Sequence, residues 1–243
     1  MATSPKLTLL KGKAALITGG TRGIGYAIAH AMVENGMNVI ITGRSAKSLA
    51  TAKKRLGKNA STVLLDVRNE KQVIAGLKKI KRENGAIDVL INNAGTVLPI
   101  KPLKSVSLKE WNTVLETNLT GMFMVTKYSL PSICDGGVIV NVLSVAAKTV
   151  FPNSEAYCAS KFGALGFTES LRMSLRAEKR DIRVVALLPG AIETELWDTL
   201  WPEAPRERML RPETVAQVVI DILKLPHGAV IENIHVGPAG GEL

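Results

Sequence analysis

The stretch AALITGGTRGIG, residues 14–25, decides the fold of this 243-residue chain. A short apolar run, Ala14–Thr18, leads through closely spaced glycines into a helical pattern near residues 23–35. A strand, a glycine-rich turn and a helix in this order predict a backbone that approaches a pyrophosphate, with helix N–H groups directed at it. The turn lacks the Gly-Lys-Ser/Thr ending of a Walker A loop and the spacing of Gly-x-Gly-x-x-Gly. We therefore interpret it as a dinucleotide-binding loop, with a chance glycine-rich turn as the alternative.

Beyond this stretch, short apolar runs alternate with amphipathic ones to the end of the chain. The expected helices lie near 23–35, 46–56, 70–83, 107–130, 155–178 and 212–224, and Pro131 ends the fourth. The expected strands are Ala14–Thr18, Asn38–Thr42, Thr62–Asp66, Val89–Asn92, Val138–Leu143, Arg183–Leu188 and Val230–Val236. This pattern predicts an α/β Rossmann fold: a single domain over residues 1–243 with a doubly wound, seven-stranded parallel sheet and helices on both faces.

The composition argues against several classes of protein. No charge-free apolar run reaches the roughly 18 residues of a membrane span, and Met1–Lys13 lacks a signal-peptide core, so we expect a cytoplasmic protein. The formal net charge is +10, but the basic clusters fall in helical patterns and aromatic residues make up only 4%, which disfavours nucleic-acid binding. Two distant cysteines and three scattered histidines give no support for a metal site.

The end of the second expected strand bears on the choice of cofactor. An acidic residue at this place would hold the adenosine ribose 2′-hydroxyl and favour NAD, but residues 41–45 read ITGRS. Arg44 instead offers a guanidinium suited to a 2′-phosphate, and Arg22 in the glycine loop can reach the same group. We predict NADP(H) over NAD(H); the alternative is that both arginines are solvated and either cofactor is used.

Two further strand ends carry candidate cofactor contacts. Asp66 can accept from the adenine amino group while the Val67 amide pairs with the ring, although a turn-capping aspartate explains Asp66 equally well. Residues 92–95 read Asn92-Asn93-Ala94-Gly95, where small residues let the backbone run beside a cofactor and the asparagine amides can tie strands together.

Tyr157 and Lys161 lie four positions apart, and Ser144 lies thirteen positions before the tyrosine. Residues at this spacing lie one above the other on a helix, so we expect the ammonium to lower the phenol pKa from its usual value of about 10. Such a phenol can give or take a proton near neutral pH, as ketone–alcohol interconversion requires. Each side chain also has a structural alternative, such as strand capping for Ser144 or a surface position for Lys161.

In order and spacing, these motifs resemble the short-chain dehydrogenase/reductase family over nearly the whole chain. The resemblance implies catalytic roles for Asn118, Ser144, Tyr157 and Lys161, and places the turn at Pro189-Gly190 over the nicotinamide. The implied cofactor contacts are Gly19, Thr21, Arg22, Gly23, Ile24, Gly25, Arg44, Asp66, Val67, Asn92, Ala94, Gly95, Tyr157, Lys161, Pro189, Gly190, Ile192 and Thr194.

Within this family the chain is similar to the 3-oxoacyl-[acyl-carrier-protein] reductases, with three departures. The C-terminal region reads VGPAGG at residues 236–241, Leu143 stands where a second serine often occurs, and residues 195–211 contain two tryptophans. The segment 195–211 is expected either to close over substrate or to pack as a surface loop against the body or another subunit. By analogy, substrate contacts are expected from Val145, Asn153, Ser154, Ala191, Ile192 and Trp197.

Chemistry and resemblance together predict an NADP(H)-dependent oxidoreductase that interconverts a ketone and a secondary alcohol by hydride transfer. Two alternatives are an NAD-linked alcohol or sugar dehydrogenase and a nucleotide-binding sensor without activity. The partners expected are a small carbonyl or alcohol substrate and further copies of the chain. A homodimer or homotetramer would form through the helices near 107–130 and 155–178.

Overall fold

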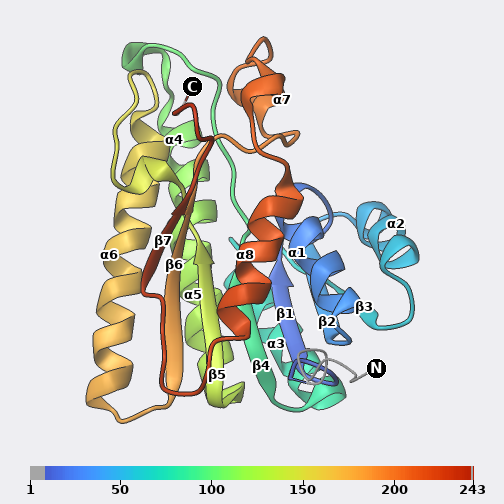
Figure 1. Cartoon of the computed structure of the whole chain (residues 1–243). Coiled ribbons are helices and arrows are strands. Elements are labelled where there is room, and N and C mark those ends of the chain that lie inside the picture. The colour runs from blue at the N-terminus through green and yellow to red at the C-terminus, as the bar shows by residue number, and fades with distance from the viewer. Residues whose placement is uncertain (1–8, 242) are drawn as a thin grey trace.

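The structure is a computed structural model that describes residues 9–241 and residue 243. Seven parallel strands form one sheet in the order β3-β2-β1-β4-β5-β6-β7 (Figure 1). The strands are β1 (Ala14–Thr18), β2 (Asn38–Gly43), β3 (Ala60–Leu64), β4 (Ile87–Asn92), β5 (Ile133–Val142), β6 (Ile182–Pro189) and β7 (Asn233–Val236). The order confirms the predicted doubly wound sheet, because the chain extends from β1 to β3 on one side and from β4 to β7 on the other.

Helices cover both faces of the sheet and give three layers (Figure 1). One face packs against α1 (Gly23–Glu34), α2 (Ala46–Leu56) and α8 (Pro212–Leu223). The other packs against α3 (Glu70–Asn84), α5 (Gly121–Ser129) and α6 (Glu155–Ala177). Strand β1 feeds both clusters, since adjacent side chains point to opposite faces: Ile17 belongs to the first and Leu16 to the second, and neither is exposed to solvent. Burial on both faces explains the nearly continuous apolar strands.

The prediction of a single α-helix near 107–130 is wrong. It consists of α4 (Leu108–Leu115), a π-helical turn at Glu116–Thr120 and α5, and it ends in a 3₁₀ turn, Leu130–Ser132, that contains Pro131. Apolar spacing could not reveal the π turn, because the residue it inserts leaves the pattern on either side helical. The turn places the side chain of Asn118 in the interior, with 1% of its surface exposed.

Other boundaries differ by a few residues. Strand β3 begins and ends two residues earlier than expected, so Asp66 lies in the loop beyond it, and β7 begins only at Asn233. The segment 195–211 contains a short helix, α7 (Trp197–Leu200), and a 3₁₀ turn, Arg206–Arg208. No helix among the described residues is both long and apolar enough to cross a bilayer.

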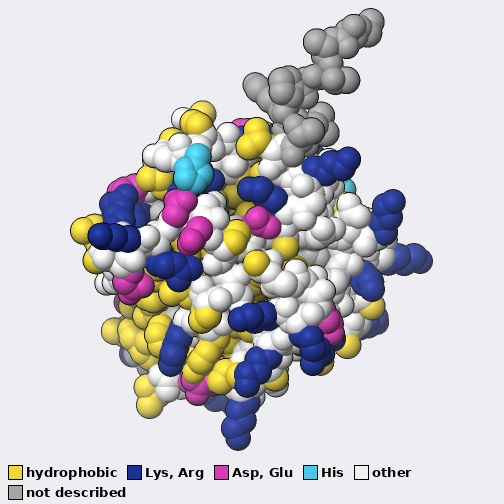
Figure 2. All heavy atoms as spheres, turned by 90° about the horizontal axis from the view of Figure 1, so that it is seen from below, with side chains coloured by type: hydrophobic (Ala, Val, Ile, Leu, Met, Phe, Trp, Pro, Cys, Tyr) yellow, Lys and Arg dark blue, Asp and Glu magenta, His cyan; other side chains and the backbone are white. Residues whose placement is uncertain are grey.

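The two ends of the sheet differ in character. The carboxyl ends of the strands lie at the top of Figure 1. Between the neighbouring strands β1 and β4 the order of the sheet reverses: the chain that leaves β1 leads to β2 on one side, and the chain that leaves β4 leads to β5 on the other. Loops diverge at such a place and leave a crevice, which is where open α/β sheets bind ligands. Figure 2 shows the opposite end, where Lys and Arg side chains are dispersed among apolar and neutral ones.

Candidate active site

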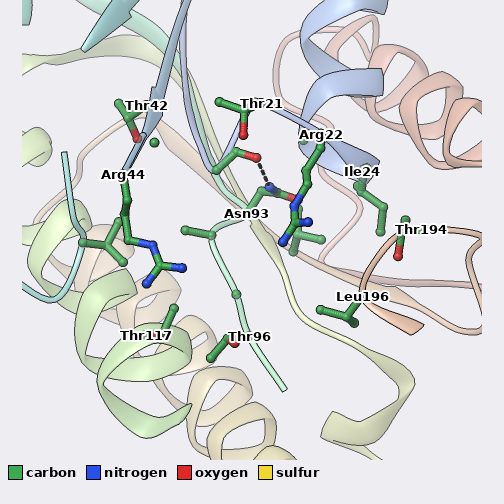
Figure 3. Close-up of a pocket in the computed structure, with 18 of the residues that line it drawn as sticks. Thr21, Arg22, Ile24, Thr42, Arg44, Asn93, Thr96, Thr117, Thr194 and Leu196 are labelled. Carbon is green, nitrogen blue, oxygen red and sulfur yellow. Dashed lines mark hydrogen bonds between the residues drawn. The ribbon is translucent and has the colours of Figure 1, made fainter. Parts of the chain in front are cut away.

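Two cavities meet at the carboxyl edge of the sheet. The first, of about 240 Å³, is lined by the loops that follow β1, β2, β3 and β4 (Figure 3). The second, of about 260 Å³, lies between the residues that follow β5 and β6 and the segment 195–211. Both are lined by Ile24, Leu143, Tyr157, Thr194 and Leu196. Tyr157 therefore stands at their junction, together with apolar side chains.

The glycine loop forms one wall of the first cavity and has no room for larger residues. Gly19 has a φ of +66°, which favours glycine, and a Cβ on Gly25 would lie 2.3 Å from the amide nitrogen of Asn93. That nitrogen donates to the carbonyl oxygens of Thr18 at 3.0 Å and Gly19 at 3.1 Å, which fixes the loop against β4. Helix α1 has no side-chain N-cap and no acidic residue in its first turn, so its N–H groups can accept an anion.

Two arginines extend toward the first cavity. Figure 3 shows Arg22 and Arg44 entering from different loops, and both side chains line the space. Asp66, near Arg44, is held by Arg68: the Arg68 Nη2 lies 2.7 Å from Oδ2, and the Arg68 backbone N–H donates to Oδ1 at 3.0 Å. These bonds hold the pKa of Asp66 below its usual value, and the charge of Arg44 contributes in the same direction. The turn-capping contact expected as an alternative for Asp66 is present, and the carboxylate also lines the cavity.

Asn92, which was expected to contact the cofactor, points into the interior of the protein. Its buried amide donates to Thr126 at 2.9 Å and to Asn141 at 2.8 Å, so it ties β4 to β5 and α5 and does not line either of the two cavities. Asn93, Ala94 and Gly95 do line the first cavity.

Sequence reasoning missed Thr42. Its hydroxyl oxygen is buried, has no hydrogen-bond partner and belongs to a residue that lines the first cavity. A polar residue that ends the apolar strand VIIT was the available signal. The other lining residues that were missed are Gly43, Leu65, Asn93, Thr96, Thr117, Val142, Leu143, Glu195 and Leu196.

Tyr157 and Lys161 project from the first turns of α6, one turn apart as predicted. The Lys161 Nζ lies 5.6 Å from the centre of the Tyr157 ring and donates to the carbonyl oxygen of Val142 at 3.2 Å. The Ser144 side chain acts on the Tyr157 hydroxyl and lowers its pKa, and both residues line the second cavity. Ser144 follows β5, and its hydroxyl also accepts from the Ala146 N–H at 3.1 Å. Three polar side chains from two elements thus converge where the cavities meet.

The prediction of a lowered pKa for Tyr157 is wrong for the protein without a bound cofactor. Burial raises the pKa of Tyr157, and the Ser144 side chain opposes this only in part. Burial also lowers the pKa of Lys161 to about 8, since the interior disfavours its charge. Burial therefore decides the direction of the pKa shift of both groups, which the sequence could not reveal. An amine with a pKa of about 8 still carries its proton at neutral pH.

Asn118 faces the start of α6 and lies outside the lining of both cavities. Its amide nitrogen donates to the Thr96 carbonyl at 2.9 Å and to the Ser160 hydroxyl at 3.0 Å, while its oxygen accepts from the Thr96 N–H at 2.8 Å. The Ser160 hydroxyl in turn donates to the Tyr157 carbonyl at 2.7 Å. The Asn118 side chain therefore couples the loop after β4 to the backbone of Tyr157.

Most expected residues around β6 and the substrate region line the second cavity. Pro189, Gly190 and Ile192 do so, and Thr194 lines both cavities. The expected substrate contacts Val145, Ser154, Ala191, Ile192 and Trp197 also line the second cavity. Asn153 lies elsewhere: it is exposed and borders a separate small cavity.

The segment 195–211 is fixed to the body at several points. The Trp197 indole N–H donates to the Ile192 carbonyl at 2.8 Å, and the Arg206 guanidinium donates to the Thr194 carbonyl at 2.9 Å. Arg206 also pairs with Asp198 at 2.8 Å. In this arrangement the segment closes one side of the second cavity with Trp197 and Trp201.

The first cavity fits a dinucleotide. Glycines without side chains give the backbone close approach, α1 offers uncapped N–H groups, and Thr42 supplies an unpartnered hydroxyl. Arg22 and Arg44 supply positive charge for phosphate groups. Within the described part of the chain, no three His, Cys, Asp or Glu side chains gather as a metal site would require.

Comparisons with known proteins agree with this geometry. Residues 13–205 match the family model for short chain dehydrogenase. The chain is 36% identical to the 3-oxoacyl-[acyl-carrier-protein] reductase of Vibrio harveyi over 239 residues, which cover 93% of this chain and 96% of that protein. A 3-ketoacyl-(acyl-carrier-protein) reductase from Brucella melitensis, solved with NADH, has a TM-score of 0.85 and 29% identity, and the match covers 93% of this chain and 97% of that chain.

A second solved structure extends the comparison to a different named activity. The alcohol dehydrogenase of Thermococcus sibiricus, solved with 5-hydroxy-NADP, has a TM-score of 0.87 and 28% identity over 96% of this chain and 99% of that chain. The family model covers most of the chain, and the relative from Vibrio matches it almost end to end. The chain belongs to the short-chain dehydrogenase/reductase family of oxidoreductases.

Proposed function

We propose that this protein interconverts a ketone and a secondary alcohol with NADP(H) as the hydride carrier. The observation that carries the proposal is the position of Tyr157, which lines both cavities with Ser144 at its hydroxyl and Lys161 beside its ring. A dinucleotide in the first cavity and a carbonyl compound in the second would meet at this side chain.

The chemistry is divided between the cofactor and the chain. When bound, the nicotinamide supplies or accepts the hydride at the carbonyl carbon. Ser144 and Tyr157 hold the carbonyl oxygen with their hydroxyl groups, and Tyr157 donates its proton as negative charge develops there. Lys161, protonated at neutral pH, favours the phenolate that remains. Asn118, held by the Thr96 backbone, positions Tyr157 through Ser160.

The preference for NADP(H) rests on charge at the adenosine end of the first cavity. Arg44 follows β2, where an acidic residue would favour NAD, and Arg22 enters the same space from the glycine loop. The two solved relatives described above were solved with NADH and with an NADP derivative, so the family alone leaves the choice open. The arginines of this chain supply the reason for NADP(H).

Replacing Tyr157 with Phe tests the proposal. The variant keeps the ring but loses the proton donor, so kcat for carbonyl reduction should fall by about 100-fold or more while NADPH affinity changes little. NADPH absorbance measures turnover and quenching of protein fluorescence measures binding. A variant that retains turnover would show that another group donates the proton, and a wild-type protein that binds NADPH but reduces no ketone would favour a sensor.

A further inference from the structure

The second cavity, called the inner cavity below, has a distinct chemical character. Apolar side chains form most of its wall, including Phe151, Trp197 and Trp201. Its polar side chains are the neutral hydroxyl groups of Ser144, Ser154, Tyr157 and Thr194. No charged side chain lines it among the described residues. An anion bound here would lose its hydration without gaining a cationic partner.

The inner cavity does not end at Trp201. A wider space of about 710 Å³, the outer groove, is lined by Pro99, Ile100, Asp198, Thr199, Leu200, Trp201, Pro202 and Glu203. Ile100, Leu200 and Trp201 line both spaces, so an apolar path joins them. Trp201 is 38% exposed and Ile100 is 46% exposed, which is a high exposure for large apolar side chains.

The charged side chains of the outer groove are both acidic. Asp198 is paired with Arg206, but Glu203 is exposed and takes part in none of the ion pairs found among the described residues. A negative group that extends from the inner cavity would therefore approach like charge. An uncharged, apolar group would cover Ile100, Leu200 and Trp201 and release water from them, which favours its binding.

From this geometry we propose the class of substrate: an uncharged ketone or alcohol whose apolar substituent extends from Tyr157 past Leu200 to Trp201. Substrates that carry a carboxylate or sulfonate on this substituent are disfavoured. The proposal rests on the proposed function, because it assumes that the reacting carbonyl lies at Tyr157. It adds what the chain selects for beyond the carbonyl group.

A matched pair of ketones tests the charge selection. Methyl 4-acetylbenzoate and the 4-acetylbenzoate anion share one reacting ketone and differ in the charge at the far end of the ring. With NADPH saturating, we expect kcat/KM for the ester to exceed that for the anion by at least about tenfold, since a buried unpaired charge costs more than 1.4 kcal/mol, the energy of one decade. Equal values would overturn the substrate class while leaving the proposed function in place.

Binding is measured separately from turnover. Trp197 and Trp201 line the inner cavity, so a bound aryl ketone should quench tryptophan fluorescence of the NADPH complex. If the ester quenches at lower concentration than the anion but neither is reduced, the substrate class stands and the proposed reaction fails. If neither ketone quenches and neither is reduced, both proposals are overturned.

A charge-reversal variant adds a directional test. Leu200→Lys would place an ammonium where the inner cavity joins the outer groove, and we expect it to shift the ratio of kcat/KM toward the anion by about tenfold. Leu103→Lys is the matched control: Leu103 is 57% exposed and lines neither space, so this variant should keep the wild-type ratio. The same shift in both variants, or in neither, would overturn the path past Leu200.

Discussion

At Lys161 the fold holds an ammonium group in the interior, with the Val142 carbonyl as its acceptor and Tyr157 beside it. Burial lowers the pKa of Lys161 to about 8, below the 10.5 that applies in an unfolded chain. Between these values the unfolded state binds more protons than the folded state, so stability rises with pH in this window. The buried ammonium thus lowers the stability of the folded protein at neutral pH, and this effect disappears at high pH, where the amine loses its proton.

Lys161→Met tests the direction in which stability changes with pH. Without cofactor, the wild-type protein should gain stability relative to the variant between about pH 8 and pH 10, by at most about 1.4 kcal/mol per pH unit for one proton. Chemical denaturation of both proteins across this range measures the difference. If the stability of the wild-type protein minus that of the variant stays constant or falls as the pH rises through this range, a buried amine with a lowered pKa is contradicted. Tyr157 titrates above this window, since burial raises its pKa, and it is present in both proteins.

Arg44 carries the second prediction at this scale. Arg44→Asp removes the cation proposed to hold the 2′-phosphate and adds a carboxylate that suits a ribose hydroxyl. The ratio of kcat/KM for NADPH to that for NADH should fall by about 100-fold or more, because the variant loses a charge-assisted contact to the 2′-phosphate and its new carboxylate repels that group. Arg55→Asp is a matched control, because Arg55 stacks on Tyr26 and does not line the first cavity. An unchanged ratio in Arg44→Asp would refute the role of this arginine.

At the scale of elements, the unit of β1, the glycine loop and α1 depends on close packing against the loop after β4. The contact is tightest at Gly25, where a Cβ would also lie 2.5 Å from the Gly19 carbonyl oxygen. The same loop is held by the Thr18 hydroxyl, which accepts from the N–H groups of Asn93 and Ala94 at 3.0 Å each. Loop and strand therefore form one closely packed surface, on which the phosphate groups of the proposed dinucleotide would lie.

Gly25→Ala tests this packing. The added methyl group must displace Asn93, so we expect a loss of about 1–3 kcal/mol in stability and weaker NADPH binding. Gly166→Ala in α6 is the control, because nothing lies within 4 Å of its added Cβ and alanine favours a helix by about 0.5–1 kcal/mol. Thermal melts and NADPH titrations compare the two. Equal melting temperatures and affinities for both variants would contradict the tight fit.

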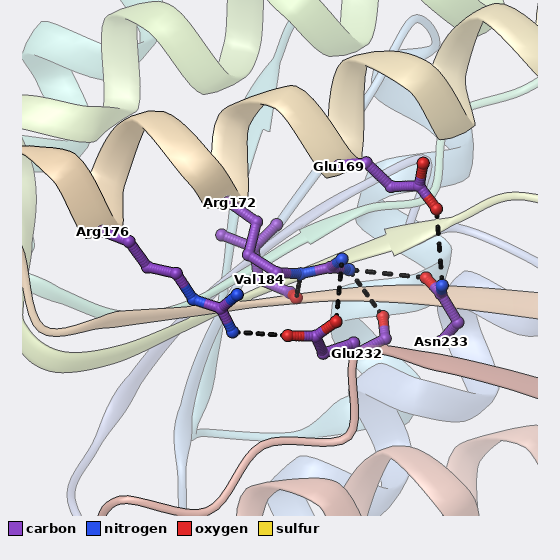
Figure 4. A network of polar contacts seen from close by, with 6 residues as sticks. All are labelled: Glu169, Arg172, Arg176, Val184, Glu232 and Asn233. Atoms are coloured by element: carbon purple, nitrogen blue, oxygen red, sulfur yellow. Dashed lines mark hydrogen bonds and ion pairs between the residues drawn. The ribbon is translucent and has the colours of Figure 1, made fainter.

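The whole molecule depends on contacts that join its layers and its edge. Figure 4 shows Arg172 of α6 reaching across β6: its Nε donates to the Val184 carbonyl at 3.0 Å and its Nη2 to the Glu232 carbonyl at 2.7 Å. The Glu232 side chain pairs with Arg172 at 3.4 Å and with Arg176. This buried guanidinium fixes the chain that leads into β7, and β7 continues into the residues beside the inner cavity.

We also predict a homo-oligomer from the outer face of the helices. Phe123 of α5 and Phe162 and Met173 of α6 are large apolar side chains that are 43%, 43% and 63% exposed. Such a face favours association through these helices. Sedimentation should give a mass of at least twice 26.0 kDa at micromolar concentration, and Phe162→Asp should reduce it. Leu64→Asp, at an exposed position on β3, should leave the mass unchanged. A 26.0 kDa species in the wild type would refute the prediction.

Local pattern determined much of this protein. The alternation of apolar runs and helical stretches predicted the parallel sheet, because periodicity and glycine placement act within a few residues. The same local rules placed Gly19 in the loop and Gly25 in the first turn of α1, and put Tyr157 and Lys161 one turn apart on α6.

Tertiary structure decided the features that depend on distant partners. Thr42 and Asn93 line the first cavity while Asn92 turns inward to Asn141, and nothing in the sequence NNAG separates the two asparagines. The pKa of Tyr157 rises because burial, a property of the whole fold, outweighs the opposing effect of Ser144, and residue spacing could not reveal that burial.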